Sequence, residues 1–234
     1  MDLREKMIDL IERNRISATE VADALGKNGV IDGIDILNSG QFIAGEAYYV
    51  LGFDRSNWPI HEQIVDVKEG SIVYIDMLNC GNQAAFGDLV AKYLKLYRKV
   101  KGMVINGLMR DNHTLVKERY PVWCQGVSPL GCYNRKVTWT EEVTAHYNKQ
   151  KETFHQGILV CDDSGVTLIR PDQITDSLYH KLEFIEIQED IWFYCIDTLK
   201  WSTYDTVCLK RYLSEPEVLP TYLRERVSNM DLEK

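Results

Sequence analysis

An arginine and an aspartate stand side by side at the end of an apolar segment, at Arg110 and Asp111. The planar guanidinium group of arginine binds a carboxylate or an enolate oxygen through paired hydrogen bonds. A carboxylate in a loop is a ligand that Mg²⁺ or Mn²⁺ accepts together with several waters. The pair therefore predicts an anion and metal site, with a solvated surface ion pair as the alternative. His113 could reach the same site or be a solvated loop histidine.

A glycine-containing loop at residues 80–88 precedes the pair. It opens onto a helical pattern, so the backbone amides near Gly87 could bind a carboxylate at the N-terminus of a helix. Glycines also occur at strand-to-helix turns that bind nothing, and the loop matches neither the Walker motif nor the dinucleotide-binding fingerprint. Asp88 is either a general base or a residue that supports the groups in direct contact with the ligand, or else the N-cap of the helix.

The loop and the charged pair are positioned by a predicted strand–helix–strand unit. Residues 71–78 and 102–109 have the continuous apolar pattern of strands that are buried on both faces. Apolar residues on one face predict a helix over 88–101, with Gly102 at its C-terminal cap. Because parallel strands present their carboxyl ends at one edge of a sheet, the loop and the Arg-Asp pair are expected to meet there.

The remaining pattern predicts an α/β core over residues 1–172 and a helical extension over 173–234 that packs on the core or on a neighbouring subunit. Helices are expected at 2–14, from the capping box Ser17–Glu20 to Gly26, near 60–67 and from 172 onward. Pro216 and Pro220 are expected to break the last helix, and the polar tail at 228–234 is expected to fray. Strands are expected at 42–51, 121–124, 137–143 and on both sides of the turn at Asp163–Gly165.

Composition and charge exclude several classes of protein. The 234 residues are 45% hydrophobic and 26% charged, as in an ordinary globular protein. The net charge of −8 argues against nucleic-acid binding, which needs clustered Lys and Arg. No apolar run approaches the roughly 20 residues of a membrane span, and the N-terminus does not resemble a signal peptide, so we expect a cytoplasmic protein. The six cysteines have no metal-binding spacing and are expected to be reduced thiols: Cys80, Cys124, Cys132, Cys161, Cys195 and Cys208.

Segments in a fixed order over residues 15–170 resemble a known family. They are Ser17–Gly26, Ile43–Ala47, Glu69–Asp76, Ala85–Leu89, Gly102–Asp111, Tyr120–Trp123, Gly126–Pro129 and Cys161–Val166. The chain is similar in them to the regulator-of-ribonuclease-E-activity A (RraA-like) family, which includes class II 4-hydroxy-4-methyl-2-oxoglutarate and 4-carboxy-4-hydroxy-2-oxoadipate aldolases. The resemblance implies a swivelling β/β/α-type sandwich that assembles as a trimer or a hexamer, with active sites between subunits.

The resemblance also implies roles for individual residues. Asp111 would hold a divalent metal, Mg²⁺ or Mn²⁺, and Arg110 would bind the C2 oxygen of the substrate and stabilise an enolate. Amides of the turn that comprises Gly87, Asp88, Leu89 and Val90 would bind the substrate carboxylate. Asp88 would help a water in proton transfer, and Glu189 would reach the site from a neighbouring subunit. The chain departs from the aldolases at Asn112–Thr114, where those enzymes carry an acidic residue.

Three functional hypotheses follow. The first is a metal-dependent carbon–carbon lyase, an aldolase or decarboxylase, whose substrate is a pyruvyl-containing 2-keto acid. The second is a non-catalytic regulator that binds another protein, as family members named for inhibiting a ribonuclease do. The third is a divergent enzyme of specialised metabolism that uses the same enolate site on an unusual substrate.

Overall fold

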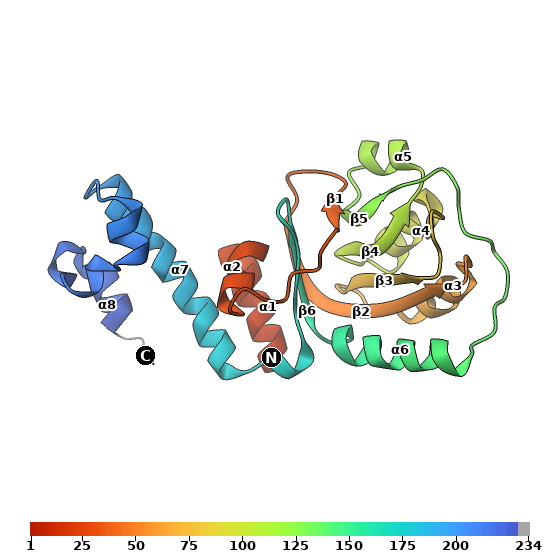
Figure 1. Ribbon diagram of the computed structural model, residues 1–234, viewed down its shortest axis with the longest axis horizontal. Coiled ribbons are helices and arrows are strands. Elements are labelled where there is room, and N and C mark those ends of the chain that lie inside the picture. The colour runs from red at the N-terminus through yellow and green to blue at the C-terminus, as the bar shows by residue number, and fades with distance from the viewer. Residues whose placement is uncertain (229–234) are drawn as a thin grey trace. The chain divides into compact units, whose positions relative to one another are not determined.

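A seven-stranded sheet forms the centre of the first unit of the chain, Met1–Asp176 (Figure 1). In the computed structural model its strand order is β1-β5-β4-β3-β2-β6-β7. The strands are β1 (Asp35–Ile36), β2 (Ile43–Phe53), β3 (Ile72–Leu78), β4 (Gly102–Met109), β5 (Val122–Val127), β6 (Ile158–Asp162) and β7 (Gly165–Ile169). Strands β2 to β5 pair in parallel, whereas β1, β6 and β7 pair antiparallel with their neighbours. This mixed sheet with its helices confirms the predicted α/β class.

The structure describes residues 1–228, with side chains up to Arg226. Residues 229–234, which hold nearly all of the tail predicted to fray, lie outside this range. Within the described residues, no helix is both long enough and apolar enough to span a membrane.

Six helices accompany the sheet in the first unit. They are α1 (Leu3–Asn14), α2 (Ala18–Ala24), α3 (Trp58–Gln63), α4 (Asp88–Lys92), α5 (Asn112–Lys117) and α6 (Glu141–Phe154). The predicted capping box of α2 is present, since the Ser17 hydroxyl accepts the Glu20 N–H and the Glu20 carboxylate accepts the Ser17 N–H. These bonds satisfy amides that have no partner inside the helix.

Alternate residues of the parallel strands enter two hydrophobic clusters, one on each face of the sheet. On β3, Val73 and Ile75 join a cluster that includes residues of α3, α4 and α5. Ile72 and Tyr74 point to the other face and join a cluster with Val143 of α6 and residues of β6 and β7. Burial on both faces explains why β3 and β4 are almost continuously apolar in sequence.

The strand predicted at residues 137–143 is wrong, because α6 begins at Glu141. The Thr140 hydroxyl accepts the N–H of Val143 at 3.2 Å and caps the helix. Glu141 and Glu142 then place negative charge in the first turn, where the helix dipole favours it. These local interactions outweigh the strand preference of the β-branched residues in this run.

The helix predicted over 88–101 is shorter than expected. After α4 the chain continues as a π-helical turn at Tyr93–Tyr97, and Lys99 takes a left-handed conformation. Gly102 does not cap this helix, because it is the first residue of β4. A Cβ atom on Gly102 would lie 2.3 Å from the Cδ1 atom of Ile43, so the glycine leaves room for the end of the Ile43 side chain.

The second unit begins at Ser177 and contains most of α7 (Asp176–Asp197) and all of α8 (Thr221–Ser228). It has its own core, which consists of Ile187, Ile191, Cys195, Tyr212, Leu219 and Leu223. Short helical turns begin at Tyr204, Arg211 and Pro216. In the aromatic run at residues 192–194, Trp192 and Tyr194 pack against this core, whereas Phe193 is exposed.

The cap of α6 gives a direct stability test. Thr140→Ala removes the hydroxyl that accepts the Val143 N–H and should lower the free energy of unfolding by about 1 kcal/mol. Thr140→Ser keeps an oxygen at this position and should stay close to the wild type. Urea unfolding followed by circular dichroism measures both, and equal stability of the alanine and serine variants would refute the cap.

Candidate active site

The predicted site lies where β3 and β4 part. Their ladder ends at the pair Asp76 and Asn106, and one extra residue on β4 relative to β5 forms a bulge just beyond it. Residues Ala84–Phe86, here called the bridging segment, then take the place of β3 beside β4. The Ala85 N–H donates to the Leu108 carbonyl at 2.8 Å, and the Arg110 N–H donates to the Phe86 carbonyl at 3.1 Å.

The other edge of the bridging segment is paired as well. The Ala84 N–H donates to the Leu130 carbonyl at 2.7 Å, and the Cys132 N–H donates to the Ala84 carbonyl at 2.9 Å. Three stretches that are distant in sequence, the loop after β3, the end of β4 and residues 130–132, thus form one hydrogen-bonded layer. This layer places Gly87 beside the end of β4, as the strand–helix–strand prediction requires.

The Asp111 side chain turns back onto the start of α4. Its backbone has φ of 59°, a left-handed conformation that aspartate tolerates better than most residues. Its Oδ2 atom accepts the N–H of Asp88 at 3.2 Å and lies 3.6 Å from the Arg110 Nε atom. The side chains of Arg110 and Asp111 remain 46% and 40% exposed, so both charged groups are open to a ligand.

Gly87 leaves no space for a side chain beside this carboxylate. A Cβ atom built on Gly87 would lie 1.7 Å from Asp111 Oδ2. The residue has an extended backbone with φ of −130°, which other residues adopt readily. The glycine is therefore needed for close approach, and it also serves as the N-cap of α4, a role that sequence reasoning offered as one alternative for Asp88.

A second glycine, Gly131, leaves space for the Arg110 side chain in the same way. Sequence reasoning did not identify it. A Cβ atom there would lie 2.4 Å from an Arg110 Nη1 atom and 3.2 Å from Cζ. The guanidinium group therefore lies directly over the backbone of residue 131. Nothing in the local sequence distinguishes this glycine from one in an ordinary turn, because its role depends on contact with β4.

The other predicted residues are placed as follows. Leu89 is exposed, Val90 is buried and Asp88 is half-buried, all in the first turn of α4. His113 is exposed in the first turn of α5. Glu189 lies on α7, and its contribution to a neighbouring subunit's site stays a prediction.

The donor set at this edge of the sheet fits a hard cation that keeps most of its waters. Residues 1–228 contain no group of three or more His, Cys, Asp or Glu side chains arranged to hold a metal ion. Asp111 offers an exposed carboxylate, and Asp88 is its neighbour through the backbone hydrogen bond. Mg²⁺ is commonly bound by one or two carboxylates together with water and substrate oxygens.

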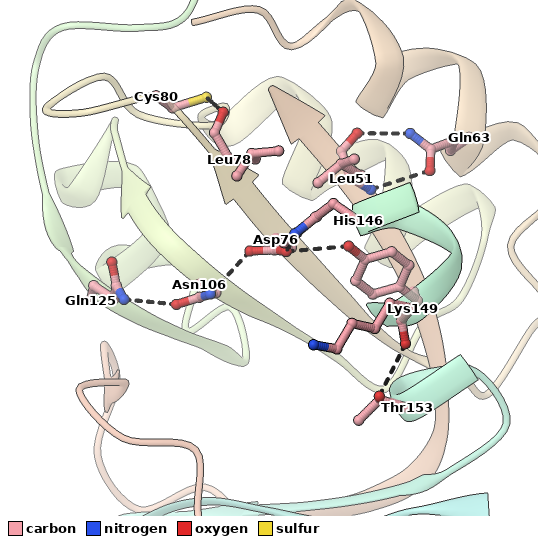
Figure 2. Close-up of polar contacts among 11 residues, drawn as sticks. Leu51, Gln63, Asp76, Leu78, Cys80, Asn106, Gln125, His146, Lys149 and Thr153 are labelled. Carbon is pink, nitrogen blue, oxygen red and sulfur yellow. Dashed lines mark hydrogen bonds and ion pairs between the residues drawn. The ribbon is translucent and has the colours of Figure 1, made fainter. Parts of the chain in front are cut away.

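A second polar cluster, centred on Asp76 of β3, lies on the α6 side of the sheet (Figure 2). The carboxylate accepts the Tyr49 hydroxyl at 3.2 Å and the Asn106 amide at 3.0 Å, and it contacts His146 Nε2 at 2.7 Å. Asn106 in turn accepts the Gln125 amide at 2.7 Å. The cluster links the four strands β2, β3, β4 and β5 to α6 through Asp76, a residue that is 8% exposed. We therefore interpret it as a structural contact that holds the helix against the sheet.

Burial and the Asp76 charge keep two tyrosines of this face neutral. Burial raises the pKa of Tyr49, and both the charge of Asp76 and its hydrogen bond add to the rise. Burial also raises the pKa of Tyr74, with a further contribution from the Asp76 charge. Both phenols therefore stay protonated in the folded protein at pH values where an exposed tyrosine ionises.

A family model and a curated protein match this chain. A family model described as RraA-like, Aldolase/RraA, matches residues 18–168. Protein DlpA of Legionella pneumophila is 28% identical over 173 residues, which are 71% of this chain and 28% of DlpA. The chain thus spans less than a third of the length of this curated relative.

Solved structures share the fold. An uncharacterized protein from Pseudomonas syringae pv. tomato str. DC3000 aligns with a TM-score of 0.62 and 20% identity, over 83% of this chain and 93% of that one. RraAS2 of Streptomyces coelicolor, described as an unusual member of the RNase ES inhibitor RraA protein family, aligns with a TM-score of 0.60 and 17% identity, over 79% and 96%. These similarities confirm the predicted fold.

The contact between Gly87 and Asp111 can be measured by a double-mutant cycle. Gly87→Ala forces a methyl group against the carboxylate and should lower the free energy of unfolding by about 2 kcal/mol. In an Asp111→Ala background the same substitution should cost much less, because the clashing atoms are gone. Equal costs in the two backgrounds would show that the methyl group meets something else.

The neutral tyrosines predict a loss of stability in alkali. Their folded pKa values lie above the unfolded value of about 10, so their contribution is complete below pH 10 and is lost as the pH rises beyond it. Tyr74→Phe cannot ionise and should flatten the fall in unfolding free energy above about pH 10. Exposed Tyr222→Phe is the control, and a fall as steep in Tyr74→Phe as in that control would contradict the assignment.

Proposed function

The chain belongs to the RraA-like family, and from this premise we propose that it is a divalent-metal-dependent carbon–carbon lyase. Its substrate would be a pyruvyl-containing 2-keto acid, which it cleaves by a retro-aldol reaction or decarboxylates. The observation that carries the proposal is the convergence of Arg110, Asp111 and the Gly87 turn at one edge of the sheet.

Arg110 has the central role in this proposal. When the C3–C4 bond of the substrate breaks, its electron pair moves toward the C2 oxygen, which becomes negatively charged. The guanidinium group, held over Gly131, would bind that oxygen and stabilise the charge as it develops. In decarboxylation carbon dioxide leaves, and in the retro-aldol reaction the C4 hydroxyl gives its proton to water and a carbonyl compound leaves. Protonation of the enolate carbon C3 then gives pyruvate or a substituted pyruvate.

The residues around Arg110 would bind and orient the substrate. Backbone amides of the turn from Gly87 to Val90 would hold its carboxylate, and half-buried Asp88 would orient the water that carries the proton. Asp111 would hold Mg²⁺ or Mn²⁺ together with water. When bound, the cation supplies positive charge near the oxygens of the substrate.

An apolar surface beside α4 supports the proposal of a homo-oligomer, a trimer or a hexamer. Leu89, Leu96 and Tyr97 are exposed on α4 and the π-helical turn that follows it. Beside them lies a cavity of about 630 Å³ that His61, Ile64, Val65, Leu89, Val90, Lys92, Tyr93 and Tyr97 line. Exposed apolar groups of this kind are typical of protein interfaces. A neighbouring subunit bound here would lie next to the Gly87 turn, and we propose that Glu189 of a neighbour completes the site.

We also propose a cytoplasmic location, because the spacing of the six cysteines in the sequence does not indicate a disulfide framework. Unbridged thiols are the rule in reducing compartments.

A coupled assay for pyruvate tests the lyase proposal. The wild type, supplied with Mg²⁺, should release pyruvate from oxaloacetate or from a 4-hydroxy-2-oxo diacid. Arg110→Ala and Asp111→Ala should each lower kcat/KM by about 100-fold or more, because each removes charge next to the reacting oxygen.

The matched controls are Arg170→Ala and Asp172→Ala, which remove another exposed ion pair, with Nε to Oδ1 at 3.1 Å, after edge strand β7. Both should retain wild-type activity. Absence of metal-dependent turnover with all of these substrates, or full activity in Asp111→Ala, would refute the proposal and favour the non-catalytic regulator.

The proposed assembly is tested by light scattering after gel filtration. The wild type should have the mass of three or six chains, and Tyr97→Asp, which puts a charge on the apolar surface, should have the mass of one. Tyr204→Asp changes another exposed tyrosine, which lies in the second unit, and should leave the assembly intact. A single-chain mass for the wild type would contradict the proposed oligomer.

A further inference from the structure

Two cysteines flank the bridging segment, one on each of the loops that it joins. Cys80 lies four residues before Ala84 in the loop after β3, and its carbonyl accepts the Gln83 N–H at 3.1 Å. Cys132 lies in the segment after β5, and its N–H donates to the Ala84 carbonyl at 2.9 Å. Backbone pairing therefore holds Cys132 against the segment that Cys80 precedes by a few residues.

The thiols of these two cysteines are hydrogen-bonded to each other. The Cys80 thiol is 2% exposed and donates to the Leu78 carbonyl at 3.4 Å (Figure 2). Hydrogen bonding from Cys132 lowers the pKa of the Cys80 thiol, and the backbone amides of Arg55 and Ser56 add to this effect against the opposing effect of burial. The same hydrogen bond raises the pKa of Cys132, which carries the shared proton.

The two thiols differ in their exposure to solvent and in their acidity. Cys132 is only half-buried, so a small oxidant can reach its sulfur. Cys80 is buried, and its sulfur is the better nucleophile of the two because its thiolate is stabilised. Cys80 differs in this from the cysteines buried elsewhere, since burial raises the pKa values of Cys124, Cys161 and Cys195 and makes their thiols less reactive.

We propose that Cys80 and Cys132 are a site of reversible oxidation, at which a disulfide links the loop after β3 to the segment after β5. The oxidant is a peroxide. One sulfur of the pair attacks a peroxide oxygen, the O–O bond breaks, and a sulfenic acid and one water form. The other sulfur then attacks the sulfur of the sulfenic acid, and the oxygen leaves as a second water. Two thiols lose two electrons and two protons, and the peroxide gains them.

The disulfide would act on the wall of the candidate active site. Cys132 follows Gly131, on which the Arg110 guanidinium rests, and the link would close a covalent loop around the bridging segment. Closing a long loop restricts the unfolded chain more than the folded one. The oxidised protein should therefore melt at a higher temperature, and this expectation does not depend on which substrate Arg110 binds.

Peptide mapping of the whole wild-type protein tests the proposal. The reduced protein is treated with one equivalent of hydrogen peroxide, quenched in acid, alkylated and digested without reductant. The expected result is a peptide pair that joins Cys80 to Cys132 and lacks two hydrogen atoms, together with a melting temperature raised by a few degrees. A thiol reductant should restore both alkylation and the original melting temperature.

Variants make the assignment specific. Cys208→Ser, which removes an exposed thiol of the second unit, should form the link as the wild type does. Cys132→Ser should leave Cys80 open to alkylation after peroxide treatment and should show no rise in melting temperature. The proposal is overturned if both thiols of the wild type stay alkylatable, if Cys132 gains oxygen without becoming linked, or if disulfides form only through Cys208.

Discussion

The candidate site depends on the double pairing of the bridging segment, Ala84–Phe86. Beyond Asp76, β3 no longer pairs with β4, which would leave the last amides and carbonyls of a buried strand without partners. Unpaired backbone groups are costly inside a protein. One edge of the bridging segment pairs with the end of β4, and its other edge pairs with residues 130–132. Gly87 follows the segment directly, so the pairing that completes the sheet also fixes the glycine against Asp111.

The Arg110–Asp111 pair is placed by this backbone framework more than by its own attraction. Ion pairs this exposed contribute about 0–1 kcal/mol to stability, which is too little to position two flexible side chains. Their places are determined instead by absent side chains at Gly87 and Gly131, by the left-handed turn at Asp111 and by the Asp88 amide. A charged pair that adds little to stability, and is open to solvent, is well suited to exchange its partners for a ligand.

Much of this arrangement could be predicted from the sequence. The apolar runs of β3 and β4 indicated parallel buried strands, and the glycine loop and the Arg-Asp pair followed at their ends. Sequence reasoning failed where contacts between distant segments decide the outcome. No local sequence signal marks Gly131, and Gly102 is required by its contact with Ile43 of β2. The members of the Asp76 cluster come from four strands and one helix. At α6 the error had a local cause, because the Thr140 cap was outweighed in the prediction by the strand-forming residues around it.

The central claim is that the Gly87 turn, Arg110 and Asp111 bind one ligand together. A crystal structure of the protein with Mg²⁺ and oxalate, which mimics the enolate of pyruvate, tests it most directly. The account predicts oxalate with one carboxylate on the amides of the Gly87 turn and an oxygen on the Arg110 guanidinium, and Mg²⁺ beside Asp111. Oxalate bound away from Arg110 and Asp111, with this ion pair unchanged, would contradict the account.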